Sequence, residues 1–233
     1  MICGVIPARK SSKRIPNKNI VKLAGKPLIE HTIDFCNKFD LFTEVFISTD
    51  CKKIAGYSKG IVKAPFLRPE ELASDHSTDK EWISHFIDWL TKGNKDYSHI
   101  MILRPTSPLR PPALMRQAIE LSLINNSPLR SVSKVPNKMV PEWMILSREN
   151  GYGAEFIQRG FEIRSQDLNS YYYPNGLFDI VCIKEFLKTG KIYGERFLLK
   201  QIPEELVNDI DTVEDLEYME RNWHNLIRKT VSL

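Results

Sequence analysis

Residues 2–20, "ICGVIPARKSSKRIPNKNI", join a short apolar run to a loop that is rich in positive charge. The run at 2–6 predicts a buried strand that ends at Pro7. The loop after it carries five cations within ten positions: Arg9, Lys10, Lys13, Arg14 and Lys18. Because like charges repel one another, this loop is costly when it is empty, and we expect a negatively charged ligand beside it.

The residues that follow the loop predict a helix and a second strand. In residues 26–39 the apolar side chains recur at helical spacing, and Pro27 suits the first turn. Residues 44–50, "EVFISTD", then have the character of a strand. This strand, loop, helix and strand form a unit that builds parallel sheets, with a right-handed crossover.

The rest of the chain continues the alternation of helices and strands. Helices are predicted around 82–90, over 113–126 and over 212–229, and strands at 99–103, 130–135, 176–183 and 197–202. This order predicts an α/β fold with a Rossmann-like, doubly wound sheet. In that class, ligands bind beyond the carboxyl ends of the strands.

Two of these helices carry further signals. In the helix over 113–126, one face is expected to contain Leu114, Ala118 and Leu121. In the last helix, Thr212 and Asp215 have the spacing of a capping box. The side chains of that helix expected to face the core are Val213, Leu216, Trp223 and Ile227.

The pattern weakens between residues 136 and 174, where short apolar clusters are broken by Gly and Asn. We interpret this stretch as a hairpin-like extension of a single domain. The core then consists of residues 1–135 and 175–233.

Composition excludes several classes of protein. The chain has 233 residues, 42% hydrophobic and 27% charged, which is ordinary for a globular domain. A net charge of +4 is too small to indicate a nucleic-acid partner. The four cysteines have no metal-ligand spacing, and no apolar run is long enough to cross a membrane. We therefore expect a cytoplasmic protein with free thiols and no membrane partner.

Polar segments interrupt the pattern at three predicted strand ends. These are the basic loop, "LRPTSPLR" at 103–110 and "DIDT" at 209–212. Cations and loop amides suit a polyphosphate, and paired carboxylates suit a divalent ion that bridges phosphate oxygens. The basic loop matches neither GxxxxGK[ST] nor GxGxxG.

Each segment also has a purely structural interpretation. The basic loop is alternatively a solvated turn or a nucleic-acid contact. Residues 103–110 form either a proline-bracketed turn or a ligand-binding turn that uses Thr106, Ser107 and Arg110. Asp209 and Asp211 either cap the following helix or point together toward a Mg²⁺ ion.

Taken together, five ordered motifs resemble the acylneuraminate cytidylyltransferases, the CMP-sialic acid synthetases. They are the basic loop, "LRPEELASD" at 67–75, "LRPTSPLR", "YPNG" at 173–176 and "DIDTVEDL" at 209–216, and the match runs from residue 5 to about 217. The resemblance implies a mainly parallel nucleotidyltransferase sheet. It also implies Mg²⁺-dependent transfer of CMP from CTP to the anomeric hydroxyl of a nine-carbon 2-keto sugar acid, with release of pyrophosphate.

The resemblance also assigns residues. Those matching the nucleotide site are Arg9, Ser12, Lys13, Lys18, Asn19, Arg68, Ser74 and Asp75. The sugar side consists of Arg104, Thr106, Ser107, Tyr173 and Asn175, with Arg164 reaching over from a partner subunit. Asp209 and Asp211 match the metal ligands, and Arg9, Lys13, Lys18 and Asp211 are the expected catalytic residues. Residues 136–174 then form a dimerisation extension, so we expect a homodimer.

Departures from the family pattern concern the acceptor. Many relatives have Gln where this chain has Arg104, and Arg where it has Tyr173. We hypothesise that Arg104 takes over the carboxylate or hydroxyl recognition that is lost with the Arg at 173, since its fork-shaped guanidinium pairs well with a carboxylate. The alternatives are a related nucleotidyltransferase for an octulosonic acid or a sugar phosphate, and a regulatory or nucleic-acid-binding module. No histidine stands in a pattern typical of a general base, and His76 is the only histidine close to one of the five family motifs.

Overall fold

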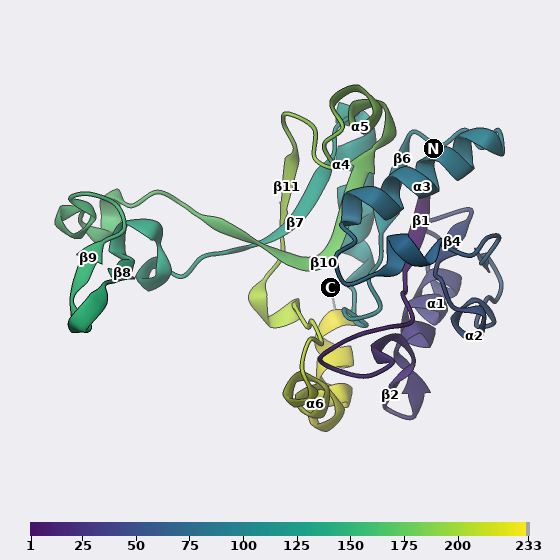
Figure 1. Cartoon of the computed structure of the whole chain (residues 1–233), viewed down its shortest axis with the longest axis horizontal. Coiled ribbons are helices and arrows are strands. Elements are labelled where there is room, and N and C mark those ends of the chain that lie inside the picture. The colour runs from purple at the N-terminus through teal and green to yellow at the C-terminus, as the bar shows by residue number, and fades with distance from the viewer. Residues whose placement is uncertain (232–233) are drawn as a thin grey trace.

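Strand β1 (Ile2–Pro7), predicted from the opening residues, lies within a seven-stranded sheet of order β11-β7-β10-β6-β1-β4-β5. The computed structural model describes residues 1–231 (Figure 1). Strand β10 (Tyr172–Cys182) runs antiparallel to both of its neighbours, and the other pairings are parallel. This mainly parallel sheet confirms the predicted fold class.

The strands and helices follow the predicted order with some additions. The further strands are β2 (Lys22–Leu23), β3 (Lys26–Pro27), β4 (Val45–Ser48), β5 (Val62–Lys63), β6 (His99–Ile102), β7 (Leu129–Lys134), β8 (Ile145–Ser147), β9 (Gly153–Glu155) and β11 (Leu198–Gln201). The helices are α1 (Leu28–Lys38), α2 (Lys52–Ala55), α3 (Asp79–Lys92), α4 (Pro112–Asn125), α5 (Ile183–Thr189) and α6 (Val213–Val231).

Both faces of the sheet are covered because alternate side chains of each strand point to opposite sides. Ile2 and Ile6 of β1 pack in one apolar cluster with residues of α1 and α4. Cys3 and Val5 pack on the other face, with α3 and Phe186 of α5. The sheet is therefore doubly wound, and its loops at the carboxyl ends of β1 and β6 lie side by side.

Two helical faces differ from the prediction. In α4, Met115, Ala118, Ile119 and Ser122 are buried, whereas Leu121 is 39% exposed. This helix is apolar over more than one stripe, so periodicity alone does not fix its rotation about its axis.

The last helix is capped as predicted, but its first residue does not face the core. The Asp215 amide donates to Thr212 Oγ1 at 3.2 Å, and Asp215 Oδ2 accepts from the Thr212 amide at 2.8 Å. Leu216, Trp223 and Ile227 pack against the third apolar cluster. Val213 is 48% exposed because it lies in the first turn, ahead of that contact.

Strands β7 and β10 extend beyond the sheet and carry residues 135–171 as an arm that projects from the body (Figure 1). The arm contains the hairpin β8–β9 and several short 3-10 helices. Among its apolar side chains, Val140 is buried. Those that are exposed include Met139, Met144, Ile145, Leu146, Tyr152, Phe156, Ile157 and Phe161.

Within the described residues, no helix is both long enough and apolar enough to cross a membrane. All four cysteines are free thiols, as predicted.

Candidate active site

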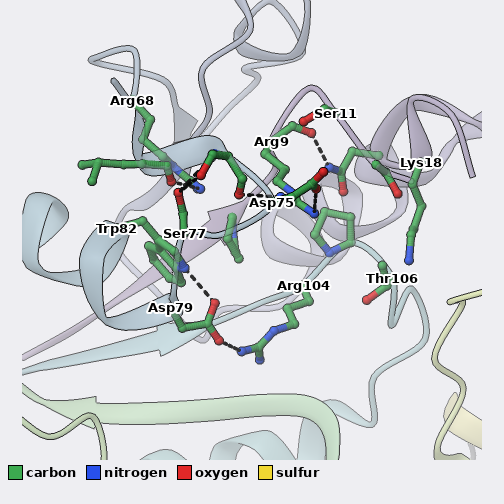
Figure 2. Close-up of a pocket in the computed structure, with 16 residues that line it drawn as sticks. Arg9, Ser11, Lys18, Arg68, Asp75, Ser77, Asp79, Trp82, Arg104 and Thr106 are labelled. Carbon is green, nitrogen blue, oxygen red and sulfur yellow. Dashed lines mark hydrogen bonds and ion pairs between the residues drawn. The ribbon is translucent and has the colours of Figure 1, made fainter. Parts of the chain in front are cut away.

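An open pocket of about 320 Å³ lies where the loops after β1 and β6 meet (Figure 2). Of the predicted nucleotide-binding residues, those lining it are Arg9, Ser12, Lys18, Asn19, Arg68, Ser74 and Asp75. Arg104 and Thr106, predicted for the sugar side, also line it. Segments that are far apart in the sequence are thus brought together at one edge of the sheet, as motif order and fold class predicted.

Asp75 neutralises two cations of the basic loop. Its carboxylate lies 3.1 Å from Arg9 Nη2 and 3.1 Å from Lys13 Nζ. The hydrogen bond from Lys13 is the main cause of the lowered pKa of Asp75, and the charge of Arg9 adds to it. Arg9 also donates to the Ser74 carbonyl at 2.7 Å. This network fixes the position of Arg9 at the pocket wall.

Asp211 neutralises two more cations. Lys18 Nζ lies 2.8 Å from Asp211 Oδ1, and Arg14 Nη1 lies 2.8 Å from Oδ2. The hydrogen bond from Lys18 is the main cause of the lowered pKa of Asp211. The repulsion expected in the empty loop is therefore reduced, because carboxylates from distant segments serve as counter-ions for four of its five cations.

Asp209 and Asp211 lie in an extended connection and not at a strand end, which corrects the prediction. Strand β11 ends at Gln201, and a 3-10 helix, Glu204–Leu206, intervenes. Burial still alternates, with Ile210 buried between the exposed Asp209 and the half-buried Asp211. The spacing of two thus leaves both carboxylates on the less buried side of the segment.

The donor set at this point fits a Mg²⁺ ion that arrives with a nucleotide. Within residues 1–231, no group of three or more His, Cys, Asp or Glu side chains is arranged to hold a metal ion. Mg²⁺ is typically bound by one or two carboxylates, with substrate phosphates and water completing its six ligands. Asp209 and Asp211 supply that number of carboxylates. Asp209 lines a pocket beside β10, whereas Asp211 lines no pocket itself but pairs with Lys18, which lines the pocket beside the basic loop.

The wall of the pocket opposite the basic loop is formed by Arg68 and Trp82. The Arg68 guanidinium donates to Ser48 Oγ at 3.1 Å and to the Ser48 carbonyl at 2.6 Å. It lies 5.4 Å from the centroid of the Trp82 ring, and burial lowers its pKa to about 10. Arg68 therefore fixes the end of β4, and Trp82 supplies an aromatic surface that the sequence analysis did not identify.

Arg104 lies between two carboxylates. Its Nη2 donates to Asp79 at 2.7 Å and its Nη1 donates to Asp179 at 3.0 Å. Burial alone would lower the pKa of Arg104, but the charges of Asp79 and Asp179 outweigh burial and raise it. Trp82 Nε1 also donates to Asp79 at 2.8 Å, as Figure 2 shows. These two aspartates were missed because one stands in a helix pattern and the other in a strand pattern.

A second pocket of about 370 Å³ meets the first one at Arg104, which lines both. The predicted residues Tyr173, Asn175 and Asp209 line this second pocket, together with Arg130 and Asp179, which were not predicted. The structure thus provides two adjoining spaces, one beside the basic loop and one beside the β10 strand.

The other predicted sugar-side residues have structural contacts near this second pocket. Ser107 is buried, and its hydroxyl donates to Asp209 and to the Gly176 carbonyl, both at 3.4 Å. The amide side chain of Asn175 bonds to Ser131 Oγ at 2.6 Å and to Ser133 Oγ at 3.1 Å. Ser107 and Asn175 therefore hold the irregular stretch of β10 between Pro174 and Asp179.

Arg110 and Arg164, both considered for the sugar side, line neither of these two pockets. Arg110 was one alternative ligand in the turn at 103–110, but it is buried and donates to Thr32 Oγ1 and to the Arg104 carbonyl. Arg164 is exposed on the arm, where it pairs with Asp167 at 2.9 Å. Within this chain, therefore, Arg164 is not part of either pocket.

A family model described as "Cytidylyltransferase" matches residues 3–225. The chain belongs to the cytidylyltransferase family. This cytidylyltransferase is 33% identical over 215 residues to a pseudaminic acid cytidylyltransferase of Campylobacter jejuni, with 92% of each chain covered. It is 36% identical over 229 residues to a CMP-N,N'-diacetyllegionaminic acid synthase of Legionella pneumophila, covering 94% of this chain and 95% of the relative.

A third relative is longer than this cytidylyltransferase. An N-acylneuraminate cytidylyltransferase of Streptococcus agalactiae is 31% identical over 219 residues, which cover 92% of this chain and 51% of the relative. Among solved structures, CMP:2-keto-3-deoxy-manno-octonic acid synthetase complexed with CTP has a TM-score of 0.66 at 14% identity, covering 96% of this chain and 98% of that chain. That similarity supports the fold assignment.

Proposed function

We propose that this cytidylyltransferase transfers CMP from CTP to the anomeric hydroxyl of a nine-carbon 2-keto sugar acid and releases pyrophosphate. The junction of the two pockets at Arg104 carries the proposal, because it places a cation-lined space next to a second space of sugar size. The relatives named for pseudaminic, diacetyllegionaminic and acylneuraminic acids support an acceptor of this class.

In the proposed reaction, cations of the basic loop bind the β- and γ-phosphates. Lys18 and Arg9 line the first pocket, whereas Lys13 lies outside its lining and pairs with Asp75, which is part of that lining. As pyrophosphate leaves, negative charge grows on its oxygens, and fixed cations stabilise that charge more in the transition state than in the ground state. To bind a phosphate, each cation either contacts it in addition to its aspartate partner or leaves that aspartate for the phosphate.

Asp211, with Asp209, would hold the Mg²⁺ ion. When bound, the ion would supply Lewis-acid chemistry that neutralises phosphate charge and lowers the pKa of the attacking hydroxyl. Lys18 lies between Asp211 and the first pocket and orients that carboxylate. Ser107 donates to Asp209 and fixes the second carboxylate.

The first test is pyrophosphate release from CTP and Mg²⁺ with a panel of 2-keto sugar acids. A no-acceptor control and UTP, ATP and GTP accompany it. Release with CTP and one nine-carbon acid supports the proposal and identifies the acceptor. Release with only an eight-carbon octulosonic acid or a sugar phosphate favours the related nucleotidyltransferase. RNA affinity that falls steeply with salt, without turnover, would favour a nucleic-acid-binding module.

We further propose that the protein acts as a cytoplasmic homodimer. The arm buries almost none of its own apolar side chains, and an exposed apolar surface of this kind is typical of a protein interface. A second copy of the chain would cover it and bring Arg164 toward the neighbouring site. Light scattering should give twice the chain mass of 27.0 kDa, and Ile145→Asp should shift the protein toward the monomer. A wild-type monomer at assay concentration would refute this part of the proposal.

A further inference from the structure

We infer that Arg130 of β7 anchors the carboxylate of the sugar acid in the second pocket. This inference rests on the proposed function, because it names the residue that recognises the acceptor's charged group. In a 2-keto sugar acid, the carboxylate is bonded to the same carbon that carries the attacking anomeric hydroxyl. Its anchor must therefore lie close to the junction of the two pockets.

The charge of Arg104 is already matched in the structure. Among the described residues, Arg104 and Arg130 are the cationic side chains that line the second pocket. Arg104 directs both terminal nitrogens at carboxylates, to Asp79 at 2.7 Å and to Asp179 at 3.0 Å. An acceptor carboxylate placed there would face two existing carboxylates. This pairing favours another cation as the carboxylate anchor, and it leaves hydroxyl recognition by Arg104 as a prediction.

Arg130 is less fully engaged than Arg104, because it shares Asp179 at a longer distance and has no second carboxylate partner among the described residues. Its Nε lies 3.4 Å from Asp179 Oδ1, but the geometry makes no hydrogen bond, and Nε is buried without an acceptor among the described residues. No protein group within residues 1–231 accepts a hydrogen bond from the rest of its guanidinium. Since Asp179 is bound more closely by Arg104, Arg130 keeps donors for an incoming anion.

The surroundings of Arg130 fix its orientation without using its donors. Its guanidinium carbon lies 4.4 Å from the centroid of the Tyr193 ring, a cation–π contact. On β7, Arg130 is paired with Asp179 of β10 and with Leu199 of β11, so its backbone is held on both sides. The side chain is 29% exposed toward the pocket. A stacked, strand-mounted guanidinium with open donors suits two-pronged binding of a carboxylate.

The test compares Arg130→Gln and Arg130→Lys with the wild type, using the acceptor found in the panel. Arg221→Gln, on the exposed side of α6, is the matched control. Arg130→Gln should raise the KM for the sugar acid by about 10- to 100-fold, the range for losing a hydrogen-bonded charge partner. The KM for CTP should stay within about twofold. The KM of Arg130→Lys for the sugar acid should lie between those of the wild type and Arg130→Gln, because lysine keeps the charge but lacks the planar guanidinium that binds a carboxylate with two nitrogens.

A second readout separates carboxylate recognition from general damage. Wild type should strongly prefer the sugar acid to its C1 amide, and Arg130→Gln should lose most of that preference. An unchanged preference, or equal losses for CTP and sugar acid, overturns the assignment of Arg130. Wild type that uses no 2-keto sugar acid overturns the proposed function and this inference with it. An active wild type with a normal Arg130→Gln variant overturns the inference alone.

Discussion

Replacing Asp211 by Asn should strengthen CTP binding without metal and abolish most turnover with it. In the structure this carboxylate pairs with Lys18, whose side chain is 12% exposed, and with Arg14, whose side chain is 64% exposed. The variant removes the counter-ion of both cations. A triphosphate then no longer competes with Asp211 for Lys18, and it meets one negative charge fewer.

The magnitude follows from the exposure of the partners. A hydrogen bond between charged groups contributes about 1.5–3 kcal/mol when it is shielded from water. Asp211 is 50% exposed, so we discount the Lys18 pair to about 1 kcal/mol and assign little to the Arg14 pair. In EDTA, CTP should therefore bind to Asp211→Asn about fivefold more tightly than to wild type.

Turnover should change in the opposite direction. If Asp211 is the principal metal ligand, its loss removes several kcal/mol of transition-state stabilisation, or at least about 100-fold in kcat. Calorimetry of CTP in EDTA and pyrophosphate release with Mg²⁺ measure the two effects. Asp209→Asn is the control, because no cation pairs with Asp209 among the described residues; it should lower turnover without tightening CTP. Weaker CTP binding or near-normal turnover in Asp211→Asn would refute the reasoning.

Three further predictions concern stability, each measured by urea unfolding. Arg104→Gln leaves the buried Asp179 carboxylate without its close partner and should lower the free energy of unfolding by about 2–3 kcal/mol. Adding Asp179→Asn should restore most of that stability, and a double variant with no recovery would contradict the pairing. Burial lowers the pKa of His99 to about 4, so the unfolded chain binds its proton first, and stability should fall by up to about 3 kcal/mol from pH 7 to pH 4. His99→Gln should flatten that dependence. Thr212→Ala removes the cap that accepts from Asp215 and should cost about 1 kcal/mol; an unchanged midpoint would refute the capping role.

The fold was predictable because its signals are local. The strand at 2–6 is indicated by a short apolar run, and α3 is indicated by five apolar side chains at helical spacing. Helix α5 was not predicted, because it has seven residues and buries only Phe186. The predicted buried face of α4 was wrong, because the sequence of this helix is apolar on more than one side.

The site was predictable where chemistry is concentrated in sequence. The basic loop could be identified from charge density alone, and the order of the motifs placed it beside 67–75 and 209–216. The counter-ions of the loop could not be identified, since Asp75 and Asp211 approach it only through the folded chain. Arg130 gave no signal either, because a single arginine in a strand is commonplace until its neighbours across the sheet are known.

Asp75 and Asp211, the counter-ions of the basic loop, explain how the protein carries a dense cluster of cations before its substrate binds. Asp211 holds Lys18 where a phosphate would later meet it, so part of the entropy of ordering that side chain is lost on folding and not on binding. The same carboxylate is our proposed metal ligand. Without nucleotide, a metal ion at Asp211 would have to approach Lys18 and Arg14, and with nucleotide we expect these cations to pair with the phosphates instead. We therefore expect Mg²⁺ and CTP each to strengthen the binding of the other by exchanging partners at this one carboxylate.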